Sequence, residues 1–181
     1  MIDNKHIYEI DLTKIDFDMD YLRDWVLKKP ELHTPNVYKF VYEANQDPYT
    51  SLLYQKYPCL ATQIIVYRFP PKWTIGLHVD SNRLGALNMP VQNTENTETI
   101  FYEYVGEPVL ELDPIKKWYN VKSKVIEVFR FNMISPVLIN NSVSPHEVKN
   151  DTSDFRISIS WSLSPEVTFE QAKAIFASYS N

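Results

Sequence analysis

The feature of this sequence that most constrains its fold is a long succession of short β-rich stretches separated by turn residues. They occupy the chain from Gln63 to Leu163, and most are rich in aromatic and β-branched side chains. In order, they read "QIIVYRF", "WTIGLHVD", "GALNMPVQ", "ETIFYEY", "KVIEVFRF", "SPVLIN", "HEVKN" and "FRISISWSL". About eight short strands at this spacing are typical of a β-sandwich or jelly roll. We therefore predict a mainly β fold.

Local signals predict a helix on each side of this β-rich region. The segment "DMDYLRDWVLKK" has apolar residues at helical spacing, offers Asp18 as an N-cap and ends before Pro30. In "VTFEQAKAIFASY", Thr168 and Gln171 have the three-residue offset of a capping box. We expect the first helix to be a packing helix and the second to close the chain on the outside of the β core.

The length and texture of the chain indicate one domain. Its 181 residues are enough for one sizeable core, and no repeat, low-complexity tract or Gly/Ser-rich linker divides them. We expect a single domain over residues 1–181. Its parts are an N-terminal helical or irregular extension that packs on the core (1–62), a β core (63–163) and a C-terminal helix (164–181).

Charge and cysteine content limit the partners and the compartment. Asp plus Glu number 23 against 18 Lys plus Arg, so no broad basic field is available for duplex nucleic acid, and we expect no such partner. The single cysteine, Cys59, rules out an internal disulfide and fits a reducing compartment. The first residues have no signal pattern, and no apolar run approaches the roughly 18 residues of a spanning helix. We expect a cytoplasmic protein without a membrane partner.

Two of the predicted strands have one apolar and one polar face. Successive side chains of a strand point to opposite faces. We expect the apolar face of "TIGLHVD" to build the core and its polar face to carry two functional groups. Its apolar face holds Ile75, Leu77 and Val79, and its polar face holds Thr74, Gly76, His78 and Asp80.

The strand "FRISISWSL" has the same pattern with unusual polar residues. Solvent faces usually carry Lys, Glu and Thr, whereas one Arg and three Ser suit the lining of a cavity as well as a solvated surface. The polar face comprises Arg156, Ser158, Ser160 and Ser162.

His78 and Asp80 are candidate metal ligands. At positions i and i+2 of one strand face, they can direct an imidazole nitrogen and a carboxylate oxygen at one point. A second His completes the ligand set of non-haem Fe(II) oxygenases. Of the other three histidines, His6 and His33 are expected to be surface or hydrogen-bonded structural residues. His146, which begins a late strand, is the natural third ligand.

The set His78, Asp80 and His146, followed ten residues later by Arg156, resembles the 2-oxoglutarate and Fe(II)-dependent dioxygenase superfamily. The resemblance covers Gln63 to Leu163. It implies a double-stranded β-helix, that is, a cupin-like jelly roll. Within the superfamily, "HVDSNRLGALNMPV" resembles phage-type and aspartyl/asparaginyl hydroxylase-like oxygenases.

The resemblance also implies an activity and its cofactors. Catalytic Fe(II) is expected on His78, Asp80 and His146. The cosubstrate 2-oxoglutarate is expected on Arg156, with Ser158 reproducing the Arg-x-Ser pattern of several members. With O2, such an oxygenase most often hydroxylates its substrate and releases succinate and CO2. The substrate expected here is a small molecule, an amino acid or a protein side chain.

Three more residues are candidates by their position. Asn88 is expected either to hydrogen-bond the cosubstrate or to be a structural asparagine. Tyr67 is expected either to hydrogen-bond the cosubstrate through its hydroxyl or to be a half-buried tyrosine of a β-strand. Arg83, just past the ligands, is expected to steer an anionic substrate or to pair with a surface carboxylate. We expect specificity to lie in the first sixty residues, Thr94 to Thr99 and "EPVLELDPIKKWYN".

Two alternatives keep the fold without the chemistry. One is a non-catalytic, cupin-like protein that binds a metal or a small acid without turnover. The other is a jelly-roll interaction module in which His78 and His146 lie far apart. Both stay open at the level of sequence, because the same sandwich hosts many functions.

Overall fold

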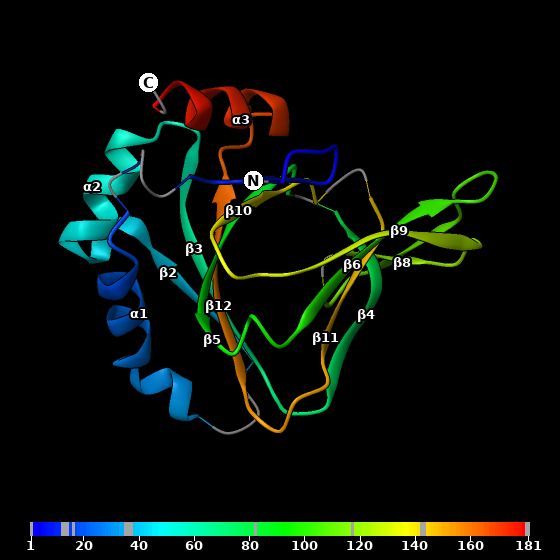
Figure 1. Ribbon diagram of the computed structural model, residues 1–181, viewed down its shortest axis with the longest axis horizontal. Helices are drawn as coiled ribbons and strands as arrows, with labels where there is room; N and C mark the ends of the chain where they lie inside the picture. The colour runs from blue at the N-terminus through cyan, green and yellow to red at the C-terminus, as the bar shows by residue number, and fades with distance from the viewer. Residues whose placement is uncertain are drawn as a thin grey trace.

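The computed structural model describes residues 2–11, 15, 17–34, 38–81, 83–116, 118–141 and 144–179. Two six-stranded antiparallel sheets face each other, and helices flank one of them (Figure 1). This arrangement confirms the predicted mainly β, double-stranded β-helix fold.

The strands alternate between the two sheets from β3 to β6 and again from β9 to β12, as in a jelly roll. The first sheet has the order β1 (Ile7–Glu9), β10 (Val137–Ile139), β5 (Ala86–Gln92), β12 (Arg156–Leu163), β3 (Leu60–Phe69), β2 (Lys39–Glu43). The second has the order β7 (Leu110–Asp113), β8 (Trp118–Val121), β4 (Trp73–Asp80), β11 (His146–Asn150), β6 (Glu98–Tyr104), β9 (Val125–Asn132). Because β3, β4, β5 and β6 alternate between sheets, residues close in sequence line both walls of the space between them.

All eight predicted stretches form strands, and the structure adds four more. Strands β1 and β2 come from the first sixty residues, so that segment contributes to the first sheet as well as supplying helices. Strands β7 and β8, which lie between β6 and β9 in sequence, form a hairpin. These extra strands have three to five residues each, too few for a period-2 pattern to stand out.

The helices begin where the sequence offers capping side chains. In α1 (Met19–Leu27) the Asp18 carboxylate accepts a hydrogen bond from the backbone N–H of Tyr21, as predicted. In α3 (Phe169–Ser178) the capping box of Thr168 and Gln171 is formed in both directions. In α2 (Pro48–Lys56) the Asp47 carboxylate accepts hydrogen bonds from the backbone N–H groups of Tyr49 and Thr50. The short elements η1 (Pro30–His33) and η2 (Ala44–Gln46) complete the described helical segments.

The larger apolar core lies between the first sheet and these helices, on the face turned away from the second sheet (Figure 1). The strands β12 and β5 send Ile159, Trp161 and Leu87 into this core. Their alternate residues therefore point into the space between the sheets. Only a small apolar cluster, which includes Phe101 and Phe131, fills part of that space. The rest is left to polar side chains. In the described part of the chain, no helix has the length and apolar character to cross a membrane.

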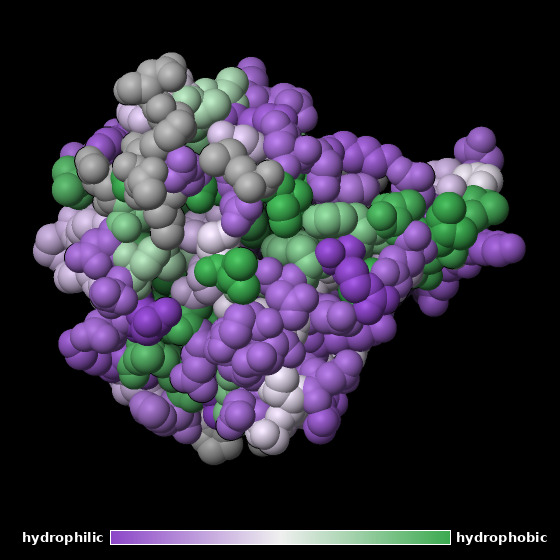
Figure 2. All heavy atoms as spheres, in the orientation of Figure 1, coloured by the Kyte–Doolittle hydropathy of each residue, from purple (hydrophilic) through white to green (hydrophobic). Residues whose placement is uncertain are grey.

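A projecting arm carries much of the exposed apolar surface. It is formed by the ends of β6 and β9 and by the β7–β8 hairpin, and it extends from the second sheet (Figure 1). Figure 2 shows apolar surface along it. The exposed apolar residues here are Val105, Val109, Leu110, Leu112, Ile115 and Ile126.

Two glycines near the ligands provide a matched test of the packing. A Cβ on Gly85 would lie 2.9 Å from the Ile139 carbonyl oxygen and 2.9 Å from Leu163 Cδ1, whereas a Cβ on Gly76 would meet nothing within 4 Å. We expect Gly85→Ala to lower the free energy of unfolding by about 1–3 kcal/mol through overpacking. Gly76→Ala should change it by less than about 1 kcal/mol. Urea unfolding measures both, and equal effects would contradict the packing at Gly85.

Candidate metal centre

Antiparallel pairing of β4 with β11 sets His78 directly opposite His146. The two imidazole rings lie 4.4 Å apart between centroids. Asp80 follows on β4, and one ligand atom from each of the three residues lies within 4.8 Å of the others. One ion can therefore reach all three after small side-chain rotations. The interaction module with widely separated histidines is not the protein observed here.

A β-bulge changes the faces of β4 from those predicted. His146 pairs with His78 and Val148 pairs with Ile75, so two residues of β4 oppose one of β11. Ile75 consequently lines the same cavity as His78, and Leu77 is only half-buried. The prediction that Ile75 faces a core opposite the ligands was wrong, because the extra residue reverses the alternation between Ile75 and His78.

Backbone carbonyls fix the tautomers of both histidines. Nδ1 of His78 lies 2.8 Å from the Gly76 carbonyl oxygen, and Nδ1 of His146 lies 3.1 Å from the Ser144 carbonyl oxygen. A carbonyl only accepts, so each Nδ1 carries the proton and each Nε2 has a free lone pair. Burial, together with the neighbouring His146, holds the pKa of His78 well below its ordinary value. The imidazole is therefore neutral at physiological pH, as metal ligation requires.

Asn141 orients the carboxylate of Asp80. Its side-chain Nδ2 donates to Asp80 Oδ2 at 2.7 Å, and its backbone carbonyl accepts from the Asp80 N–H at 3.4 Å. Asp80 Oδ1 lies 3.9 Å from Nε2 of His78. The amide thus occupies one carboxylate oxygen and leaves the other beside the imidazole nitrogen, the usual arrangement around a ligating carboxylate.

The three ligands open into a cavity between the two sheets, and the other candidate residues line it as well. Ser160 joins Ser158 there, whereas Ser162 is half-buried and does not line the cavity. His6 is buried and hydrogen-bonded to Ser144, and His33 is exposed, as predicted for both. The candidates in the cavity are Tyr67, His78, Asp80, Arg83, Asn88, His146, Arg156 and Ser158.

Arg156 places a positive charge deep in this cavity without a carboxylate partner among the described residues. Its side chain is buried, Nε donates to Thr97 Oγ1 at 2.9 Å, and Nη1 donates to Ser158 Oγ at 3.1 Å. The guanidinium also lies over the Phe69 ring, 5.3 Å from its centroid. Burial lowers the pKa of Arg156 to about 10, which leaves it charged at neutral pH. A buried charge without a counter-ion is costly, so this site is built for an anion.

Comparison with known proteins supports the fold. No family model matches the sequence, and no curated protein matches it. A Pseudomonas putida prolyl-4-hydroxylase is 10% identical with a TM-score of 0.48, over 90% of this chain and 95% of that chain. An oxidoreductase of the 2OG-Fe(II) oxygenase family from Burkholderia pseudomallei is 12% identical with a TM-score of 0.52, over 88% of this chain and 84% of that chain. The chain has the fold of a 2OG-Fe(II) oxygenase. The match to the Burkholderia pseudomallei protein confirms the fold that the resemblance implies.

Arg83 lies inside the cavity of this oxygenase fold and does not pair with a surface carboxylate. Nη2 donates to Ser160 Oγ at 2.7 Å, and Nη1 donates to the Tyr67 hydroxyl at 3.3 Å. Its nearest carboxylate is Asp80, with 3.8 Å between Nη1 and Oδ2. Its side chain is 13% exposed.

Three further residues of the site were not predicted from the sequence. The Trp118 ring lies 4.3 Å from the His78 ring, because β8 pairs with the ligand strand of the oxygenase fold. Thr97 is buried against Arg156, although its segment "NTENTET" predicts a solvated turn or lid. Asn141 reaches Asp80 from the loop before β11. Each of these residues takes part in a contact between distant segments. The sequence indicated Trp118 and Thr97 only in that both lie in segments expected to determine specificity.

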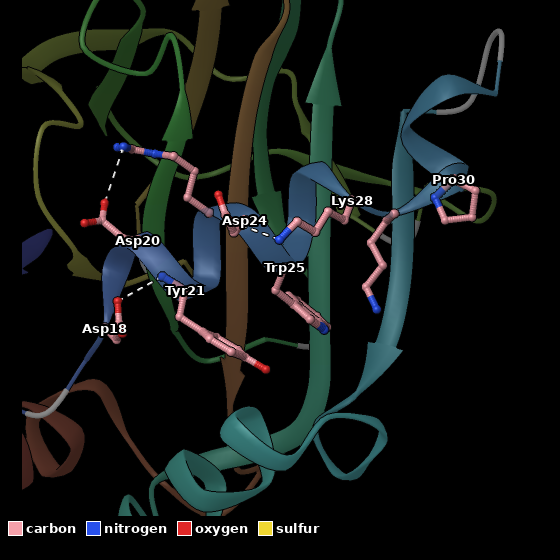
Figure 3. A pocket seen from close by; sticks show the side chains of 9 residues that line it. Asp18, Asp20, Tyr21, Asp24, Trp25, Lys28 and Pro30 are labelled. Atoms are coloured by element: carbon pink, nitrogen blue, oxygen red, sulfur yellow. Dashed lines mark hydrogen bonds and ion pairs between the residues drawn. The ribbon is translucent and has the colours of Figure 1, made fainter.

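A second hollow, on the surface of α1, has a different character. Figure 3 shows Asp18 bonded to the backbone N–H of Tyr21, and Lys28 paired with Asp24 at 3.1 Å. Because these charges are neutralised within the helix and exposed to water, nothing in this hollow demands a ligand. The cavity between the sheets is therefore the candidate site.

The hydrogen bond from Asn141 to Asp80 predicts an effect on metal affinity. We expect Asn141→Ala to weaken Fe(II) binding by about 10–100-fold, because the ligating carboxylate loses its orienting partner. Competition with a chromophoric chelator under anaerobic conditions measures this. Asn140→Ala is the matched control, since that side chain donates to the Lys5 carbonyl oxygen away from the site. Equal Fe(II) affinity in folded Asn141→Ala protein would contradict the assignment.

Proposed function

We propose that this protein is an Fe(II)- and 2-oxoglutarate-dependent oxygenase. It hydroxylates a small molecule, an amino acid or a protein side chain and releases succinate and CO2. One observation carries the proposal: two imidazoles, one carboxylate and the uncompensated guanidinium of Arg156 share one cavity. A metal-binding site without a cosubstrate has no need of that buried charge.

The three ligands fit Fe(II). His78 and His146 offer Nε2, and Asp80 offers Oδ1, so the donor set is two nitrogens and one oxygen. This is the two-histidine, one-carboxylate set that leaves further coordination positions open. All three come from one sheet, which leaves the facing wall to organic ligands. Trp118 covers the His78 ring, and Ile75 and Val148 add apolar surface that limits access by water.

Arg156 suits the distal carboxylate of 2-oxoglutarate. Its planar fork can grip a carboxylate through two parallel N–H···O bonds, which a lysine cannot do. Thr97 and Ser158 hold Nε and Nη1 and thereby set the plane of the fork. Burial raises the pKa of Tyr67, so its hydroxyl stays protonated and able to donate to the cosubstrate. Asn88, on the neighbouring strand, offers a further amide donor.

With these groups in place, the bound iron supplies the oxidising chemistry: O2 is consumed, 2-oxoglutarate gives succinate and CO2, and one oxygen atom enters a C–H bond of the substrate. The chain's own part is to position the reactants. His78, Asp80 and His146 would hold the metal, and Arg156 would hold the distal carboxylate of the cosubstrate.

Metal and cosubstrate binding together test the activity. Fe(II) and 2-oxoglutarate, mixed anaerobically with the protein, should give a weak visible charge-transfer band, and air should then release succinate. His78→Ala should abolish the band because one of three ligands is lost. His33→Ala, which removes an exposed histidine, should leave it unchanged. Wild-type protein with neither Fe(II) uptake nor a band would refute the proposed activity.

The role of Arg156 separates cosubstrate binding from metal binding. We expect Arg156→Gln to weaken 2-oxoglutarate binding by about 2 kcal/mol or more, roughly thirtyfold, because a desolvated carboxylate loses its charged partner. Fe(II) affinity should change little. Arg68→Gln is the control, since Arg68 stacks on Phe155 and does not line the cavity. Titration of the charge-transfer band gives both constants, and wild-type 2-oxoglutarate affinity in Arg156→Gln would show that the clamp is elsewhere.

A further inference from the structure

A second arginine in the cavity has no role in the ligand or cosubstrate set described above. Arg83 comes from the short segment between β4 and β5 and lies among residues of both sheets. Its described hydrogen-bond acceptors, Tyr67 and Ser160, are neutral hydroxyls. Its Nε is buried and, among the described residues, has no hydrogen-bond partner. This guanidinium therefore has a donor that no described residue satisfies.

Asp80 does not neutralise this charge in the loaded site. The 3.8 Å from Arg83 Nη1 to Asp80 Oδ2 is too long for a hydrogen bond. Asn141 already occupies Oδ2, and Oδ1 is the atom beside His78 Nε2. When Asp80 ligates a dication, its negative charge is committed to the metal. Arg83 then has no anionic partner among the described residues.

The charges that line the cavity lead to the same conclusion. Arg83 and Arg156 contribute two positive charges and Asp80 contributes one negative charge, and a histidine that ligates a metal adds none. Fe(II) adds two positive charges, and the dianion 2-oxoglutarate removes two. One positive charge remains unneutralised among side chains that are mostly buried. Such a charge is stable there only beside a further anion.

The two guanidinium groups also lie at different positions along β12. Arg156 bonds to Ser158, whereas Arg83 bonds to Ser160, one step further along the same strand face. Ser158 and Ser160 are separated by about 7 Å, two residues of an extended strand. Arg83 also contacts the metal ligand Asp80, which Arg156 does not. The anion at Arg83 therefore lies at the metal end, beside the reacting atoms.

We propose that Arg83 forms a second anion subsite, which binds the carboxylate of the substrate. This inference rests on the proposed function and specifies its substrate class: a small organic acid. Tyr67 and Ser160 hold the guanidinium, and the planar fork of an arginine matches a carboxylate. Because only 13% of the Arg83 side chain is exposed, the acid must enter the cavity to reach it.

Acetate serves as the probe of this subsite. The protein is loaded with Mn(II) and saturating 2-oxoglutarate, and 13C-labelled acetate is added in steps. The measured quantity is the 13C relaxation rate of acetate, which a paramagnetic metal increases at close range. We expect saturable binding for acetate and none for neutral acetamide. Arg83→Gln should weaken acetate binding by about tenfold or more, and Arg83→Lys by less, because the charge remains but the fork is lost. Lys116→Gln, which removes an exposed charge outside the cavity lining, should bind acetate as wild type does.

A second measurement separates this subsite from the cosubstrate clamp. In the charge-transfer titration, Arg83→Gln should bind 2-oxoglutarate within about threefold of wild type, unlike Arg156→Gln. Loss of 2-oxoglutarate affinity equal to that of Arg156→Gln would assign Arg83 to the cosubstrate and overturn the inference. The inference would also be overturned if both Arg83 variants bound acetate as tightly as wild type does, or if the wild-type protein showed no saturable acetate binding. A wild-type protein without a charge-transfer band instead overturns the proposed function, so the two failures are distinguishable.

Discussion

Apolar burial on one face of the first sheet is the constraint on which the rest of this structure depends. In a simple β-sandwich, the main core fills the space between the sheets. Here the larger core lies between the first sheet and the helices, with Trp161 and Leu87 among its buried side chains. The strands are anchored from outside, and their inner face is free to carry Arg156 and two serines. A polar cavity inside a small β protein is possible because its stability comes mainly from elsewhere.

Within that cavity, the protein keeps its charges and its neutral groups apart. Backbone carbonyls hold both imidazoles in the tautomer that a metal requires, so little reorganisation is needed when the ion arrives. The two guanidinium groups are held mainly by hydroxyls and not by carboxylates. A hydroxyl fixes the direction of a donor without cancelling its charge. The positive potential is thereby preserved for anions that come from solution.

The sequence predicts those parts of the fold that follow from local chemistry. Alternation along "FRISISWSL" correctly separates the core side chains from the cavity residues Arg156, Ser158 and Ser160. Helix starts at Asp18 and Thr168 follow from caps within three residues. The metal ligands follow from the small number of histidines and from the family resemblance.

The remainder depends on pairing between distant segments. The bulge that turns Ile75 toward the ligands arises from the register between β4 and β11, which the β4 sequence alone does not specify. Asn141 and Thr97 each reach a site residue about sixty positions away in the chain. Trp118 reaches His78 only because a hairpin folds back on β4. No periodicity within a short window contains that information.

The β7–β8 hairpin pairs with β4 on the edge opposite β11, and in sequence it lies between β6 and β9, so neither strand that supplies the ligands is joined to it directly. Its length and composition can therefore change over evolution without disturbing the pairing of β4 with β11. The cavity wall that Trp118 forms beside the metal ligands can therefore vary in sequence independently of the ligands. Proteins descended from one ancestor with this fold can exchange that wall, and so diverge in what they admit, while they inherit the same ligands unchanged.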